Sequence, residues 1–453
     1  MARHRWTDFA RDAATQTRLA LPIMGAQLAL VGMGAADTII VGRYSAHDLA
    51  AVAVGSSIWF PALLFLSGVL MAVTPHVARL YGGGRARELG AYLGNALWLG
   101  VVAGGLAAAA LLLAERGLAV SGIDPGVCRS AAAYLAGVAA GMPAIGVFQV
   151  LRSLCEGLHD TRPILWVSLV GLAVDAPANY LLVFGGFGVP PLGALGCGIA
   201  TGLAMWTMTG ALWLYVRRAP AYTATGLFER RWRLRRAPTL HVLRVGLPIG
   251  LSLFFEVTLF AAITLLVAGL GTTVVAAHQI ALNVSTVLFM VPLSLGMALT
   301  VRVGFARGGD DPAAARRCAA NGMRLGGFLG LVQAGCMLVG AEYAVRLYTA
   351  DPAVRDLAVS LIRLAAFFQL SDTLQVTAAG ALRGYEATRS IMLITLPSYW
   401  LVGLGTGIWL ALSDLPPGPL GVHGFWIGML AGLSVAAALL AWRLRVVGRA
   451  AAA

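Results

Sequence analysis

Residues 21–42 have the sequence LPIMGAQLALVGMGAADTIIVG, an apolar run whose only charged side chain is that of Asp37. A run of about 20 apolar residues is long enough to cross the hydrocarbon core of a bilayer as a helix. The run follows a long charged stretch and lacks a small-residue cleavage pattern, so we interpret it as a retained membrane helix rather than a signal peptide.

The same segment recurs in the second half of the chain, 226 residues later, as LPIGLSLFFEVTLFAAITLLVA at 247–268. Further pairs keep nearly the same shift: MAVT 71–74 with MALT 297–300, EGLHDTRPI 156–164 with RGYEATRSI 383–391, and LGALG 192–196 with LGVHG 420–424. A nearly constant shift over such a length indicates an internal duplication.

The composition places the whole chain in a membrane, since 59% of its 453 residues are hydrophobic and only 12% are charged. Soluble domains have about 25% charged residues. Charged or Gly/Pro-rich turns divide the chain into twelve apolar spans, at 19–41, 50–79, 89–114, 130–152, 163–185, 192–216, 242–269, 275–305, 318–341, 357–381, 390–412 and 420–442.

Each half contains six spans, an even number, so both halves enter and leave on the same side of the membrane as parallel repeats. We therefore predict an all-α polytopic membrane protein with twelve transmembrane helices in two six-helix lobes. The N-terminal lobe is 1–216, the cytoplasmic connecting loop is 217–241, and the C-terminal lobe is 242–453. A cleft between lobes is the expected place for a substrate.

The charge distribution predicts the orientation of these spans. All 33 basic residues are arginines, and with the N-terminus inside only six fall on the outer side: Arg43, Arg116, Arg129, Arg346, Arg355 and Arg363. This asymmetry follows the positive-inside rule with both termini cytoplasmic. We interpret the arginine-rich stretch 217–238 as an orientation and lipid-headgroup anchor rather than a nucleic-acid site. The five scattered cysteines have no CxxC spacing, which argues against a disulfide framework or a metal cluster.

Four acidic residues lie within the apolar spans: Asp37, Asp175, Glu256 and Asp372. A carboxylate near the centre of a membrane helix costs about 3 kcal/mol or more. Counting residues from the nearest arginines, at about 1.5 Å each, places Asp372 and Glu256 near the midplane and Asp37 closer to the outside. For each acid the alternative to a functional role is a structural hydrogen bond between packed helices.

Polar residues accompany these acids at helical spacing, which indicates a shared polar interior. On the C-terminal spans, Gln369 and Gln375 lie one turn either side of Asp372, Glu256 shares a face with Ser252 and Phe260, and Gln279 with Asn283 and Thr286. The first half carries Asp37, then Asp175 one turn from Asn179, and Thr201 on the next span. We expect no arginine at the depth of the acids, which must then be protonated, bound to a cation or hydrated.

The acids are not repeated in the two halves. When the halves are aligned, Asp37 matches Ile263, Glu256 matches Leu30, and Asp372 matches Ile145. The two halves therefore share a scaffold and differ in function.

From about residue 19 to 442 the sequence resembles the multidrug and toxic compound extrusion (MATE) transporters, in particular their bacterial NorM-type branch. The resemblance rests on GAADTIIVGRYSAHDLAAVAVGSSIWFP, VLMAVTPHVARLYGGG, LFFEVTLF, AAHQIALNVS and QLSDTLQVTAAGALRGYEATR. It implies two six-helix lobes and a drug/cation antiporter that is not an enzyme, needs no cofactor and does not use ATP.

Residue by residue, the resemblance implies that Glu256 and Asp372 are the cation-site carboxylates, which would hold Na⁺, and that Phe260 faces the bound cation. Asp37 matches the acidic residue of the N-terminal lobe, and Asn179 and Thr201 match its polar neighbours. Substrate contacts are implied for Gln279, Ser57 and the outer-loop Asp351, and the polar faces add Asn283 and Gln375. Asp175 departs from the Asn-x-Pro pattern of the NorM type and leaves the coupling ion, Na⁺ or H⁺, open.

We therefore expect a secondary active efflux antiporter in the bacterial inner membrane that exports amphipathic organic cations in exchange for Na⁺ or H⁺ and functions as a monomer. The alternative is a flippase for lipid-linked oligosaccharide or peptidoglycan precursors with the same architecture. A flippase needs basic groups to hold a pyrophosphate, whereas the deep residues of this chain are acidic.

Overall fold

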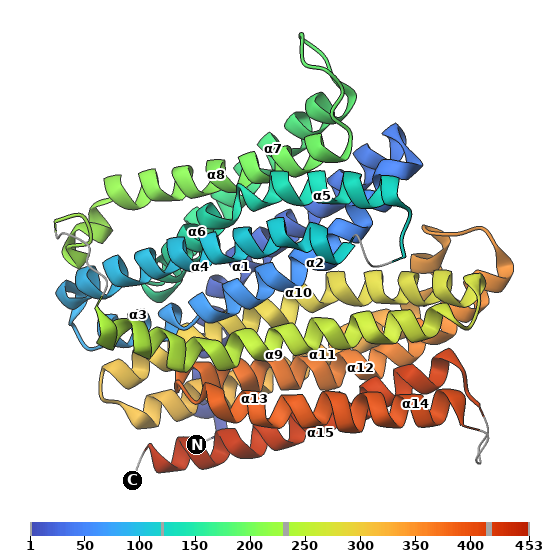
Figure 1. Cartoon of the computed structure of the whole chain (residues 1–453). Coiled ribbons are helices and arrows are strands. Elements are labelled where there is room, and N and C mark those ends of the chain that lie inside the picture. Colours follow the sequence, from blue (N-terminus) through green and yellow to red (C-terminus); the bar gives the residue numbers. More distant parts are fainter. Residues whose placement is uncertain (1, 119–121, 230–234, 414–418, 452–453) are drawn as a thin grey trace. The chain divides into compact units, whose positions relative to one another are not determined.

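The protein is helical throughout the part of the chain that the computed structural model describes, residues 2–118, 122–229, 235–413 and 419–451 (Figure 1). The sole β-type pairing among these residues is an isolated bridge between Gly186 and Val189. Eleven helical segments in the described residues are long and apolar enough to cross a membrane, and one bent pair of helices adds a twelfth span. The prediction of an all-α protein with twelve spans is confirmed.

The helices form two compact units, Gly25–Leu253 (the N-unit) and Met1–Met24 with Phe254–Ala453 (the C-unit). Helices α1 (Ala2–Tyr44) and α9 (Arg236–Ala268) each contribute to both units. The lobe boundaries drawn from the sequence, which fall in the loop 217–241, remain a prediction.

The N-unit is completed by the following elements: α2 (Ala46–Leu70), α3 (Val73–Gly82), η1 (Ala86–Glu88), α4 (Leu89–Leu118), α5 (Pro125–Ala139), α6 (Met142–Gly157), α7 (Arg162–Phe184), α8 (Ala194–Arg218) and η2 (Pro220–Thr225). The C-unit is completed by α10 (Thr272–Gly308), α11 (Pro312–Arg346), α12 (Pro352–Gly384), α13 (Thr388–Pro397), the π-helix η3 (Ser398–Leu404), α14 (Gly405–Leu412) and α15 (Val422–Ala450).

Helix α1 begins much earlier than the span predicted from hydropathy, which started at residue 19. Its 43 residues extend over about 64 Å, twice the thickness of a hydrocarbon core. The charged early turns remain helical because they contact α10 and α11, which belong to the same C-unit. Asp12 accepts hydrogen bonds from Arg302 (2.7 Å) and Asn321 (2.6 Å), and the Gln16 amide donates to the carbonyl of Leu295 (3.0 Å).

The fourth predicted span, 130–152, is not one straight helix, since α5 and α6 meet at an angle of 43°. The cause is Pro143 at the start of α6, which lacks an N–H and clashes with the preceding turn. The bend removes helical partners from backbone carbonyls inside the membrane. The indole of Trp206 on α8 donates to one of them, the carbonyl of Ala140, at 2.9 Å.

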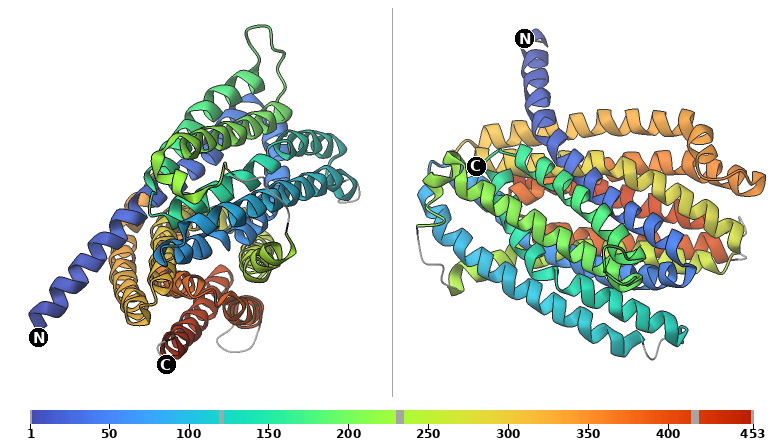
Figure 2. Two further views of the ribbon diagram at one scale, coloured as in Figure 1. Left: turned by 90° about the vertical axis from the view of Figure 1, so that its left-hand side faces the viewer. Right: turned by 90° about the horizontal axis from the view of Figure 1, so that it is seen from above.

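Within the C-unit, whose helices from α10 to α15 are coloured yellow to red in Figure 2, α12 packs against α10, α11 and α15. The crossing with α10 is close because two glycines face each other. A Cβ atom added at Gly380 would lie 2.3 Å from the carbonyl oxygen of Gly296. The Thr300 hydroxyl donates to the Gly380 carbonyl at 2.8 Å and fixes this register. Small residues at such crossings are the usual way in which membrane helices approach closely.

We expect Gly380→Ala to destabilise the protein by about 1–3 kcal/mol, since α10 and α12 must separate to admit the methyl group. The matched control is Gly335→Ala on α11, where a Cβ meets nothing within 4 Å and alanine favours the helix. Thermal unfolding of both variants in detergent measures the difference. Equal melting temperatures would contradict the close crossing.

Candidate functional site

In the N-unit, four predicted polar residues converge from three helices. On α7, Asn179 donates a hydrogen bond from its side-chain amide to Asp37 on α1. On α8, the Thr201 hydroxyl donates to the other carboxylate oxygen of Asp37 at 3.4 Å. Asp37, Asn179 and Thr201 are all buried. The structure therefore brings these three side chains together around one carboxylate.

Asp175 lies one helical turn from Asn179 and is completely buried. Neither of its carboxylate oxygens has a hydrogen-bond partner among the described residues. It lies close enough to Asp37 for the two carboxyl groups to interact electrostatically. Two carboxylates in an apolar surrounding repel each other unless a proton or a cation lies between them. The chemistry of this cluster therefore suits a bound proton or a small cation.

In the C-unit, Glu256 on α9 and Asp372 on α12 interact electrostatically with each other. Asp372 is 4% exposed, and Glu256 is partly exposed. Both amide atoms of the fully buried Gln369 lack a hydrogen-bond partner among the described residues. An unpaired buried polar group costs about 1–3 kcal/mol. Such groups beside two carboxylates are suited to a hydrated or ion-binding interior.

A small cavity adjoins Glu256. Its walls come from α9, η3 and α15, and it is lined by Glu256, Leu259, Phe260, Tyr399, Gly403, Met429, Gly432 and Leu433. Its volume of ≈ 10 Å³ corresponds to roughly one water molecule or one small ion. The Phe260 ring packs edge-on against Phe368 with a centroid separation of 6.3 Å. Phe260 thus lies at the cavity beside Glu256, as predicted, and its contact with a cation remains a prediction.

A buried arginine bears on one expectation. Arg383, at the end of α12, is 8% exposed and acts electrostatically on Glu256, but its Nε has no hydrogen-bond partner among the described residues. The expectation that no arginine at the depth of the acids neutralises them stays a prediction.

The predicted substrate residues divide into exposed and buried sets. Gln279, Asn283 and Thr286 are exposed along one face of α10, and Ser57 is exposed on α2. Amides and hydroxyls along a membrane helix avoid lipid, so this face of α10 is suited to an aqueous space. Gln375 is buried, and Asp351 caps α12 by accepting a hydrogen bond from the backbone N–H of Ala353 at 2.9 Å. Substrate contacts for these residues remain predictions.

Comparison with known families gives the chain an identity. The family model MatE matches residues 22–181 and 248–409, most of the chain, and the two matches begin 226 residues apart, as the internal repeat does. The chain belongs to the MATE family of transporters.

MATE relatives cover almost the whole chain. It is 45% identical to "Multidrug resistance protein PmpM" of Pseudomonas aeruginosa over 94% of this chain and 90% of that protein. It is 44% identical to "Probable multidrug resistance protein NorM" of Shewanella oneidensis over 95% of this chain and 94% of that protein. Relatives with these names support multidrug efflux transport, and no enzyme activity is indicated.

Solved structures confirm the MATE fold. The eukaryotic MATE transporter AtDTX14 superposes with a TM-score of 0.86 at 20% identity, covering 98% of each chain. A MATE family transporter described as outward-facing superposes with a TM-score of 0.87 at 19% identity, covering 97% of this chain and 96% of that chain. At this identity the likeness concerns the fold alone.

Sequence reasoning missed Tyr399 as a residue of this MATE protein's C-unit site. Tyr399 lines the cavity beside Glu256 and is 3% exposed. One signal was present in the sequence: Tyr399 is an aromatic residue with a hydroxyl group, placed directly after Pro397-Ser398 in an apolar span.

The two acids of the N-unit cluster should respond differently to neutralisation. We expect Asp37→Asn to lower stability by about 1.5–3 kcal/mol, because Asn179 and Thr201 donate to this carboxylate. Asp175→Asn should lower stability less, since no N–H or O–H of the described residues donates a hydrogen bond to the Asp175 carboxyl group. Thermal unfolding in detergent at neutral pH compares the two. A larger loss for Asp175→Asn contradicts this assignment.

Proposed function

We propose that the protein is a secondary active antiporter that exports amphipathic organic cations in exchange for Na⁺ or H⁺. The supporting observation is the pair Glu256 and Asp372, two interacting carboxylates, of which Glu256 lines a cavity with room for one small ion. Na⁺ is a hard cation that prefers oxygen ligands, and carboxylates also accept protons. In this proposal the ion is transported cargo, not a resident cofactor.

The coupling follows from charge competition. An ion or proton that enters at Glu256 and Asp372 lowers their combined negative charge and weakens their attraction for an organic cation, which is released outside. The membrane potential then favours inward movement of the ion by about 2.3 kcal/mol per charge per 100 mV. The polar face of Gln279 and Asn283 supplies amides among apolar walls, which suits an amphipathic substrate.

The flippase alternative gains no support from the buried arginines. Arg152 pairs with Glu156 at 2.8 Å, and Arg383 interacts with Glu256. The Arg152 guanidinium is thus paired with a carboxylate of the chain and is poorly placed to hold a pyrophosphate.

Loss of either carboxylate should abolish coupling. Asp372→Asn and Glu256→Gln, purified and reconstituted in liposomes, should lose ethidium transport at least tenfold under an imposed gradient. The matched control is Asp356→Asn, an exposed acid on α12. Full transport by both site variants contradicts the proposal.

The same liposomes identify the ion when the two gradients are imposed separately. A Na⁺ gradient at equal pH on both sides tests sodium coupling. A pH gradient in choline buffer tests proton coupling.

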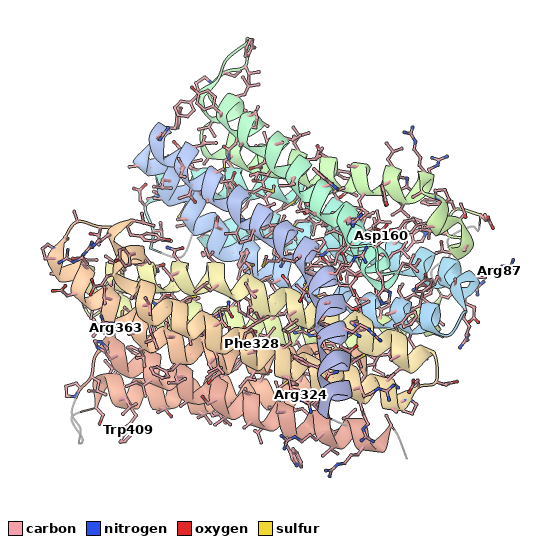
Figure 3. All side chains as sticks on the ribbon, turned by 180° about the vertical axis from the view of Figure 1, so that it is seen from behind. Arg87, Asp160, Arg324, Phe328, Arg363 and Trp409 are labelled. Carbon is pink, nitrogen blue, oxygen red and sulfur yellow. The ribbon has the colours of Figure 1, made fainter. Side chains whose placement is uncertain are left out.

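We further propose that the protein is a monomer in the bacterial inner membrane with both termini in the cytoplasm. The support is the excess of arginine on one side of the spans. Within the C-unit, Arg363 and Trp409 lie toward one end of the helices and Arg324 toward the other (Figure 3). A green fluorescent protein fused to the C-terminus should fluoresce, and an alkaline phosphatase fused at the same place should be inactive. The reverse result contradicts the orientation.

A further inference from the structure

An apolar groove opens on the N-unit where α5 and α8 pack against each other. Its volume is ≈ 450 Å³, within the range of about 300–1,000 Å³ that is usual for ligand pockets. The two helices approach closely at its floor, where a Cβ added at Gly137 would lie 2.6 Å from the backbone carbon of Gly198. The walls are formed by Ala136, Ala140, Leu195, Ile199, Leu203 and Trp206. All of these side chains except that of Leu195 are exposed.

The groove has the length of one leaflet of a bilayer. Its lining residues on α8 run from Leu195, the second residue of the helix, to Trp206. Eleven residues of helix rise about 16 Å, and half of a hydrocarbon core of ~30 Å is about 15 Å. The groove therefore extends from the membrane surface to the region of the midplane.

Trp206 forms the inner end of the groove. Its indole N–H donates to the carbonyl of Ala140, at the bend between α5 and α6, with a distance of 2.9 Å. The one polar atom of the ring is thus bonded to the protein backbone, and the rest of the ring is hydrocarbon. The inner end of the groove is therefore as apolar as its walls.

Arg129 continues the groove face of α5 toward the membrane surface. It precedes Ala136 by seven residues and Ala140 by eleven, spacings that place side chains on one face of a helix. Arg129 is exposed, and its Nε donates to the carbonyl of Pro125 at 3.4 Å, a long hydrogen bond. A guanidinium has five N–H donors and pairs well with phosphate, so this bond leaves it able to hold one.

We propose that the groove binds one phospholipid, with an acyl chain between α5 and α8 and the phosphate at Arg129. Lipid chains are as apolar as leucine, so selectivity comes from close packing in the groove and from the pairing of arginine with phosphate. An organic cation is a poorer occupant, because Arg129 repels it and no carboxylate lines the groove. In the orientation proposed above, the lipid belongs to the periplasmic leaflet.

The test uses phosphatidylglycerol that carries a photoreactive diazirine in its acyl chain. It is cross-linked to the purified full-length protein in detergent, and the labelled peptides are mapped by mass spectrometry. We expect labels within 136–140 and 195–206, and unlabelled phosphatidylglycerol should displace them. Arg129→Gln removes the phosphate contact, and Ala136→Phe fills the groove. Each change should lower this labelling at least fivefold.

Arg116→Gln and Ala110→Phe on α4 are the matched controls. Both residues are exposed, belong to the N-unit near the same end of its spans as Arg129, and lie outside the groove. Their labelling should equal that of the wild type. Melting temperatures in detergent show whether each variant is folded, and Arg129→Gln, a change at an exposed residue, tests the proposal even where Ala136→Phe does not fold.

Three results overturn the proposal. Labelling of equal strength on the exposed face of α4 indicates lipid that surrounds the protein without a site. Displacement of the label by ethidium but not by phosphatidylglycerol indicates a substrate pocket. Unchanged labelling in Arg129→Gln contradicts the phosphate contact.

Discussion

The need to keep carboxylates out of lipid is the constraint on which the arrangement of this protein depends. Hydrocarbon offers no hydrogen bond and no counter-charge, so each acid within a span must find partners inside the helix bundle. Asp37 finds them in Asn179 and Thr201, and Glu256 lies near Arg383. Asp175 is buried without a hydrogen-bond donor among the described residues, and Asp372 is buried and interacts electrostatically with Glu256.

The corresponding helices of the two duplicated halves differ in shape and in the acids that they carry. In the N-unit, Pro143 bends α5 and α6 apart, and Trp206 satisfies a carbonyl freed at the bend. The corresponding helix of the second half, α12, is continuous from Pro352 to Gly384 and carries Asp372 near its middle. The continuous helix α12 has an acid, Asp372, among its buried residues. The bent pair α5 and α6 has Ile145 at the matching position. One ancestral scaffold thus supports two different interiors.

Much of the fold follows from the sequence, because lipid thickness fixes the length of each span and the repeat fixes their number. Helix ends were less predictable: hydropathy detects the apolar part of α1, but Asp12 and Gln16 extend the helix through contacts with residues far along the chain. The grouping of Asn179 and Thr201 around Asp37 was implied by the resemblance to the MATE family, since spacing alone relates only Asp175 to Asn179. Tyr399 could not be predicted, because a π-turn holds more residues than an α-turn, so a face drawn at 3.6 residues per turn misplaces its side chain.

The division of α1 between the units has a consequence for the biogenesis of the protein. Asp12 and Gln16 leave the ribosome before their partners Arg302, Asn321 and Leu295, which follow 290, 309 and 279 residues later. At about 5–20 residues per second, translation of this interval lasts roughly 15–60 s. During that time the first turns of α1 lack their native contacts. The C-unit therefore contains a segment that is synthesised before the whole N-unit, and its assembly cannot proceed strictly in the order of synthesis.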